Sequence, residues 1–106
     1  MKSAKKYGLV LQHDALFQNE AYGKPISERL SNLLRRNTSK NDFANVALRS
    51  NVSFSTIRDV VYRTNSLTKG NAKAIALLLH AAFENSIAAR LQAEADALFL
   101  EDMMGL

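Results

Sequence analysis

The chain lacks several residue types that would point to particular protein classes. It contains no cysteine and no tryptophan, and only one proline and four glycines. Without cysteine, disulfide bonds and thiolate metal ligands are excluded. Its two histidines, His13 and His80, are far apart in the sequence and suggest no metal site. A chain of 106 residues that is 47% hydrophobic can bury one core without such supports, so we expect a single domain with no metal and no cofactor.

Signatures of catalysis and of membrane insertion are also missing. The chain has no glycine-rich phosphate loop, no cysteine nucleophile and no His–carboxylate set at a useful spacing, so we predict that it is not an enzyme. No apolar run approaches the roughly 20 residues of a membrane span, and the apolar stretch after the N-terminal lysines is too short for a signal peptide. We therefore expect a cytoplasmic protein with no membrane partner and no small-molecule ligand.

Charge is divided unevenly along the chain, whose net charge is +4. Residues 1–73 hold thirteen Lys or Arg and five Asp or Glu, a net charge of +8. Residues 74–106 hold one Arg and five acids, a net charge of −4. This asymmetry indicates a basic pole and an acidic pole, and it favours a nucleic-acid partner for the basic one. The alternative is the ordinary solvated surface of a basic protein.

Hydrophobic periodicity predicts a first helix over residues 25–36. Pro25 suits a first helical turn, and apolar residues follow it at helical spacing, at Ile26, Leu30, Leu33 and Leu34. The helix would end in Arg35 and Arg36, whose positive charges suit a helix C-terminus and need no ligand to explain them.

Two further helices are predicted on either side of a short turn. Asp42 is expected to cap the first of them, and Ser53 the second, over residues 54–63. The first would turn apolar residues towards the core, namely Phe43, Val46, Ala47 and Leu48. Asp59 is expected to pair with Arg63, four residues along the same helix.

Residues 46–62, VALRSNVSFSTIRDVVY, have the features of a helix-turn-helix. Ala47 is small where two crossing helices come closest, and Asn51 tolerates the positive φ that the turn needs. The wedge between the helices would be filled by Val52, Ile57 and Val60. The outward face would hold Phe54, Ser55, Arg58, Asp59 and Tyr62, and a helix presented in this way is typical of one that enters a DNA major groove.

The C-terminal third predicts two more helices. LTKGNAKAIALLL, residues 67–79, has a polar start capped by Thr68 and an apolar body that is typical of a core helix. SIAARLQAEADALFLEDMM follows, with an apolar stripe opposite its acids. Because neither Pro nor Gly separates the two segments, one continuous helix is the alternative. An exposed stripe of this kind indicates a protein partner, unless it folds back onto residues 7–17.

Residues 42–83 resemble the helix-turn-helix core of the lambda-repressor-like (XRE/Cro) family, and the similarity extends past the motif to that family's fourth helix. Two departures from the family pattern concern the turn and the helix starts. Asn51 stands where the family usually has glycine. Phe43 and the pair Phe54-Ser55 stand where the family often has glutamine, which holds phosphate and reads bases.

The resemblance implies an all-α, five-helix domain with a short N-terminal arm and a long C-terminal helix. The expected parts are an arm over 1–24, a helix-turn-helix DNA-binding core over 25–85 and a C-terminal helix over 86–106. In the family this last helix often forms the dimer, so we expect a homodimer held by Ile87, Leu91, Leu98, Phe99 and Met103.

The predicted function is a sequence-specific transcriptional regulator that binds double-stranded DNA. Residues expected to face base edges are Ser53, Phe54, Ser55 and Arg58. Residues expected to meet phosphates lie around this helix and at the start of the fourth, namely Arg49, Arg63, Asn65, Thr68, Lys69 and Asn71. The resemblance also implies that Asn71 matches a polar position that often meets the DNA backbone. The missing glutamines favour an alternative, a protein-interaction module or an antitoxin on a scaffold with weak DNA reading.

Overall fold

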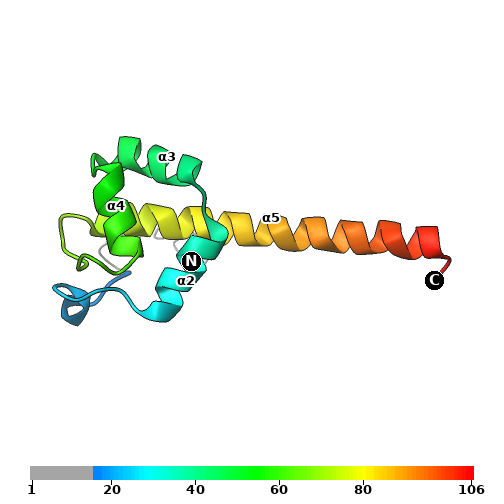
Figure 1. Cartoon of the computed structure of the whole chain (residues 1–106), viewed down its shortest axis with the longest axis horizontal. Helices are drawn as coiled ribbons and strands as arrows, with labels where there is room; N and C mark the ends of the chain where they lie inside the picture. Colours follow the sequence, from blue (N-terminus) through cyan, green and yellow to red (C-terminus); the bar gives the residue numbers. More distant parts are fainter. Residues whose placement is uncertain (1–15) are drawn as a thin grey trace, which may run out of the picture.

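The computed structural model describes residues 16–106, so most of the predicted arm over 1–24 lies outside the described part. Within that part the chain forms four α-helices, one short 3-10 helix and no β-strand, which confirms the all-α prediction (Figure 1). In chain order these are η2 (Asn19–Ala21), α2 (Glu28–Asn37), α3 (Lys40–Ser50), α4 (Phe54–Val61) and α5 (Ala72–Met104).

The first predicted helix begins later than residue 25. Ser27 is the N-cap of α2, and its Oγ accepts a hydrogen bond from the Leu30 N–H at 3.1 Å. The chain before it is extended because it pairs with the loop that precedes α5. Gly23 N–H donates to the Leu67 carbonyl at 2.8 Å, and Leu67 N–H donates to the Lys24 carbonyl at 2.9 Å.

The start of α3 also differs from the prediction. Ser39 is the N-cap, and Asp42 is the third residue of the helix rather than its cap. The Asp42 carboxylate accepts the Ser39 N–H at 3.0 Å, while Ser39 Oγ accepts the Asp42 N–H at 3.4 Å. This reciprocal capping box starts α3 three residues earlier than expected and leaves a short connection from α2.

The turn between α3 and α4 follows the prediction. Asn51 has φ 62° and ψ 23°, which is the left-handed conformation, and its N–H donates to the Ala47 carbonyl. Ser53 caps α4 by accepting the Thr56 N–H at 3.1 Å. α4 ends at Val61 rather than at residue 63 because Arg63 has φ 66°, a left-handed value that ends a helix.

The core lies among α2, α3, α4 and the first third of α5, and its largest fully buried side chains are Leu34, Ile57, Val60, Val61, Leu67, Ile75 and Leu78. Val52 and Ala47 pack against it. The prediction for Leu48 is wrong: it is 83% exposed, because two residues along a helix turn a side chain to the face opposite the buried Val46.

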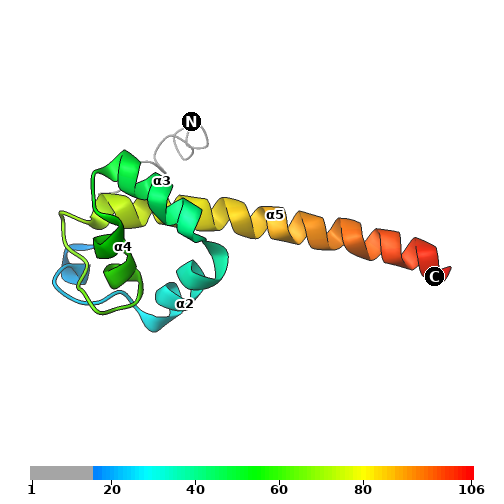
Figure 2. The same ribbon diagram turned by 45° about the horizontal axis from the view of Figure 1, so that its top comes forward.

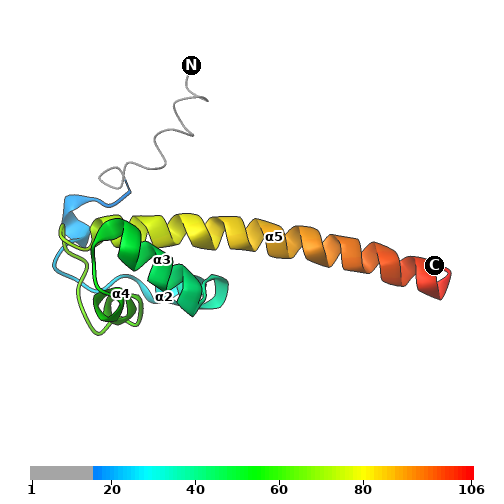
Figure 3. The ribbon, with the colours of Figure 1, turned by 90° about the horizontal axis from the view of Figure 1, so that it is seen from above.

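The two helices predicted in the C-terminal third form one continuous helix, α5, so the described residues hold four α-helices rather than five. Its buried residues all lie between Ala72 and Ala82. Beyond them α5 projects from the other helices, as Figures 1, 2 and 3 show from three directions. At about 1.5 Å per residue it spans about 50 Å, which accounts for most of the molecule's longest extent of 55 Å.

α5 also has the length and hydropathy of a membrane span, which was not expected from the sequence. An 18-residue window of this 33-residue helix has a mean hydropathy of 1.2, and 28% of the window is buried inside the molecule. Length and composition alone are weak grounds for a membrane role, because the core helix of a soluble domain meets the same criterion.

Candidate functional site

α4 presents two contrasting faces. Ile57, Val60 and Val61 are fully buried, and they hold the helix on the core. Of the residues predicted to face bases, Ser53, Phe54 and Ser55 lie at the start of α4, and Arg58 lies in its last turn. The Ser53 hydroxyl is already used within the helix start, since it accepts the Thr56 N–H and lies 2.9 Å from Thr56 Oγ1. The exposed face therefore offers an aromatic ring, a hydroxyl and a guanidinium.

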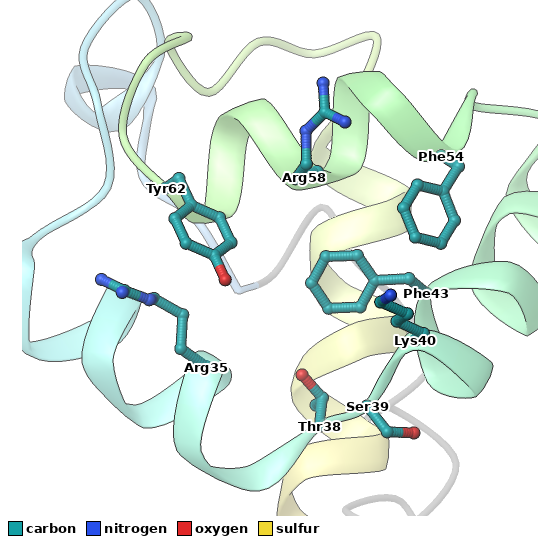
Figure 4. Close-up of a pocket in the computed structure, with 8 residues that line it drawn as sticks. All are labelled: Arg35, Thr38, Ser39, Lys40, Phe43, Phe54, Arg58 and Tyr62. Atoms are coloured by element: carbon teal, nitrogen blue, oxygen red, sulfur yellow. The ribbon is translucent and has the colours of Figure 1, made fainter.

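A pocket of about 220 Å³ lies beside this face, where the end of α2 and the start of α3 meet α4 (Figure 4). In Figure 4, Tyr62 and Arg35 lie on one side of the opening, and Phe43 and Phe54 lie on the other. The pocket is lined by Arg35, Thr38, Ser39, Lys40, Phe43, Phe54, Arg58 and Tyr62. Its walls thus combine three aromatic rings with three cations.

Two of the rings, Phe43 and Phe54, form a pair. Their centroids are 5.5 Å apart and their planes are tilted by 49°, which is a favourable arrangement for aromatic side chains. Phe43 is buried, whereas Phe54 is 37% exposed. These are the two helix-start positions at which the chain departs from the glutamines of the lambda-repressor-like pattern. Phe43 and Phe54 thus form an apolar wall at the positions where the resemblance would lead one to expect two polar side chains.

The cations of the pocket differ in how they are paired. The Arg35 guanidinium lies 4.4 Å from the centre of the Tyr62 ring, a cation–π contact. Arg58 donates from Nε and Nη2 to Asp59 Oδ1, each at 3.2 Å. Neither Arg35 nor Lys40 has an ion pair with another described residue. The expected Asp59–Arg63 pair is thus wrong, because Asp59 is bound to its neighbour in the sequence.

Two residues predicted to meet phosphates have structural roles. Arg63 donates from Nε to the Ile26 carbonyl at 2.7 Å and lies 3.6 Å from Glu28, which ties the end of α4 to the start of α2. Asn71 is buried, and its side chain accepts the Thr68 N–H at 2.9 Å and donates to the Ser66 carbonyl at 3.2 Å. Little of the Asn71 amide is left for a ligand.

The other predicted phosphate residues are not gathered at the α4 face. Thr68 is not the N-cap of α5; its Oγ1 accepts the Asn71 N–H and shapes the turn that precedes the helix. Lys69 lies 5.9 Å from the Tyr22 ring, and Asn65 is exposed in the loop after α4. Arg49 lines a separate pocket between α3 and α5. Of the predicted contacts, only Phe54 and Arg58 line the pocket beside α4.

Six of the eight pocket residues were not among the predicted contacts, and they include Arg35, Lys40 and Tyr62. Arg35 was explained by the macrodipole at its helix end, and Lys40 precedes Asp42, where the next helix was expected to begin. Their common location depends on how α2, α3 and α4 pack together, and no spacing within the sequence signals it.

Comparisons with known proteins assign no family to this geometry. No protein-family model, curated protein or solved structure matches the chain. The lambda-repressor-like resemblance therefore rests on residues 42–83 themselves, and functional conclusions rest on the site described above.

Proposed function

We propose that the protein is a cytoplasmic, helix-turn-helix regulator of transcription that binds double-stranded DNA through α4. The observation that supports this proposal most is the presentation of α4. Its buried face is fixed by three residues with no exposed surface, while Ser55 and Arg58 point outward on a short, capped helix. A helix that is anchored on one side and polar on the other can enter a major groove, about 12 Å wide, without disturbing the core.

The surroundings of α4 support an anionic partner. Arg35 and Lys40 flank it, and within residues 16–106 the only carboxylate bonded to a pocket cation is that of Asp59. Residues 74–106, with their net charge of −4, belong mostly to α5, which extends away from this face. DNA phosphates would therefore be attracted to these cations. Once the Arg58 guanidinium leaves Asp59, it could form a bidentate hydrogen bond with the edge of a guanine.

We further propose that the projecting part of α5 forms a homodimer. Leu91, Leu98, Phe99 and Met103 are between 56% and 69% exposed, and Ile87 is half-buried on the same helix. Burial of such side chains against a second copy removes apolar surface from water. A two-fold dimer would present two α4 helices to a palindromic site.

Duplex binding measured at two salt concentrations tests the DNA proposal. Affinity should fall steeply between about 50 and about 200 mM salt, with a slope of about 0.9 per neutralised phosphate. Arg58→Ala should cost about 1–3 kcal/mol of binding free energy and relax base preference at one position. Arg90→Ala, which removes the same charge from α5, is the matched control and should change affinity little.

A further variant separates a groove role for Arg58 from a purely local pair. Asp59→Asn should raise duplex affinity, because it removes a negative charge and frees the guanidinium. Absence of duplex binding by the wild-type chain even at low salt would contradict the regulator proposal.

The second candidate function is a protein-interaction module on the same scaffold. It is favoured by the apolar Phe43–Phe54 pair at the helix starts, where polar base-reading side chains would be useful, and by the exposed end of α5. A protein partner bound tightly by a chain without duplex affinity, and released by Phe54→Ser, would support this candidate.

A further inference from the structure

We propose that the pocket between α2, α3 and α4 binds a small phosphate monoester with a planar ring, and that this ligand and DNA exclude each other. The binding site stands on the geometry of the pocket alone. Only the exclusion rests on the proposed DNA function.

The size of the pocket limits the ligand. Its volume is about 220 Å³. Pockets for drug-sized ligands hold roughly 300–1,000 Å³. The space therefore suits one ring and one charged group, with any further part of the ligand outside the opening.

The positive charges of the pocket favour a negatively charged ligand. None of the eight lining residues is acidic, and Arg35 and Lys40 have no carboxylate partner among the described residues. Arg58 uses Nε and Nη2 on Asp59 and keeps Nη1 available. Two unpaired cations match the two negative charges of a phosphate monoester better than the single charge of a carboxylate or a phosphodiester.

The Thr38 and Ser39 hydroxyls of the pocket are already hydrogen-bonded within the protein. Thr38 Oγ1 donates to the Leu34 carbonyl at 2.6 Å, and Ser39 Oγ lies 3.3 Å from Asp42 Oδ2. The Asp42 carboxylate also occupies the start of α3 by accepting the Ser39 N–H. Phosphate recognition therefore depends on the side-chain nitrogens of Arg35, Lys40 and Arg58.

The aromatic side chains that line the pocket favour a ligand with a planar ring. Phe43 and Phe54 form an apolar surface opposite Tyr62, whose ring is half exposed. A bare inorganic anion would use the cations but leave this surface in contact with water. A planar group between the rings would bury it and add stacking contacts. A nucleoside monophosphate is one chemical class with both features.

Competition with DNA follows from shared residues. Phe54 and Arg58 line the pocket and also belong to the face of α4 that we propose enters the major groove. A bound phosphate would draw the Arg58 guanidinium inward and place negative charge beside α4. The ligand would thereby release the protein from DNA, which gives the chain a means of regulation within a single small domain.

Phenyl phosphate is the probe for the site, with inorganic phosphate, phenol and benzoate as controls. Its titration into the full chain is followed by backbone amide NMR shifts and by calorimetry, without DNA. We expect phenyl phosphate to bind at least about tenfold more tightly than any control, because only it uses the cations and the rings together. The shifts should centre on residues 35–43 and 54–62.

Paired variants test the named contacts. Arg35→Gln and Tyr62→Leu should each weaken phenyl phosphate binding about tenfold or more. Arg36→Gln, which removes an exposed charge from the next position of α2, should leave it unchanged. Unfolding midpoints of all variants show whether a loss of binding reflects a loss of fold, and Lys40→Gln provides a second test of the phosphate contact at an exposed position.

Separate readouts distinguish failure of the pocket from failure of the DNA proposal. Phenyl phosphate binding no tighter than inorganic phosphate, or equal effects of the Arg35 and Arg36 variants, would overturn the pocket proposal whatever DNA does. If the chain binds phenyl phosphate but has no affinity for duplex DNA, the pocket proposal is supported and the regulator proposal is contradicted. Simultaneous binding of phenyl phosphate and a duplex, with no change in either affinity, would overturn the exclusion.

Discussion

At the scale of single residues, two left-handed positions bound the helix that we propose reads DNA. Asn51 ends α3 with φ 62°, and Arg63 follows α4 with φ 66°. A side chain with a Cβ is strained in this region, although asparagine tolerates it better than most. At each position the backbone is strained, and the same left-handed conformation ends a helix.

The effect of a substitution at Asn51 on the free energy of unfolding should depend on how well the new residue tolerates a positive φ, and not on its polarity. Asn51→Gly should keep or raise the free energy of unfolding, by up to about 1 kcal/mol, because glycine adopts φ 62° without strain. Asn51→Val should lower it by about 1–2 kcal/mol, since a β-branched side chain is poorly accommodated there. Urea denaturation measures both. Asn65→Val, at an exposed position with ordinary φ, is the control, and an equal loss there would contradict the explanation.

Arg63 combines strain with a hydrogen bond that joins α4 to α2. Arg63→Ala should lower the free energy of unfolding by about 1–2 kcal/mol, because it removes the bond to the Ile26 carbonyl and keeps the unfavourable φ. Arg63→Gly should cost less, because glycine relieves the backbone. Thermal unfolding of the two variants gives the comparison. A greater loss in the glycine variant would show that the strain is negligible.

At the scale of elements, the start of α5 is set by a turn rather than by a cap on the helix itself. Thr68 and Asn71 bond to each other through both backbone N–H groups and both side chains. Asn71 Nδ2 also donates a hydrogen bond to the Ser66 carbonyl. This closed set of bonds positions the first core residues of α5 and accounts for a buried polar side chain at the domain's centre.

Asn71 and Lys69 should therefore respond differently to truncation. Asn71→Ala should lower the free energy of unfolding by about 1–3 kcal/mol, because the Thr68 N–H and the Ser66 carbonyl lose their partner. Lys69→Ala should change stability by less than about 0.5 kcal/mol. If Lys69 meets a phosphate, its variant lowers the salt slope of duplex binding by about 1. Calorimetric unfolding and duplex titration of both variants separate the two roles.

At the scale of the whole molecule, α5 begins inside the folded domain and continues beyond it as a projecting helix. The first third of α5 is core, and every residue after Ile87 is exposed. Good helix formers such as Ala, Leu, Glu and Arg let it continue beyond the domain. Its exposed apolar side chains explain why a second copy of the chain is proposed as the partner at this end, whereas DNA is proposed as the partner at the basic one.

Dimerisation through α5 predicts unfolding that depends on protein concentration. For the wild-type chain, the unfolding midpoint should rise with concentration, because association stabilises the folded state by mass action. Leu91→Gln with Leu98→Gln should abolish this dependence and give a monomer in sedimentation. Leu48→Gln, at a leucine on α3 that is more exposed than either of these, should leave the dimer intact. Sedimentation of the wild-type chain only with lipid vesicles would indicate a membrane contact instead.

The sequence by itself determined those features that depend on neighbouring residues along the chain. The left-handed turn at Asn51 and the cap at Ser53 were predictable because each depends on the preferences of one residue and its nearest backbone. The helical state of most segments followed from periodicity. The burial of Ile57 and Val60 followed from the same pattern.

Tertiary structure decided what depends on contacts between distant segments. The extended chain before α2 pairs with the Leu67 backbone, so a periodicity that favoured a helix from residue 25 was overruled. Asn71 and Arg63 were drawn into internal hydrogen bonds, whereas Arg35, Lys40 and Tyr62 were brought to α4 from other elements. The physical reason is that periodicity reports which face of a helix is apolar, while only packing decides which polar side chains from separate helices share one pocket.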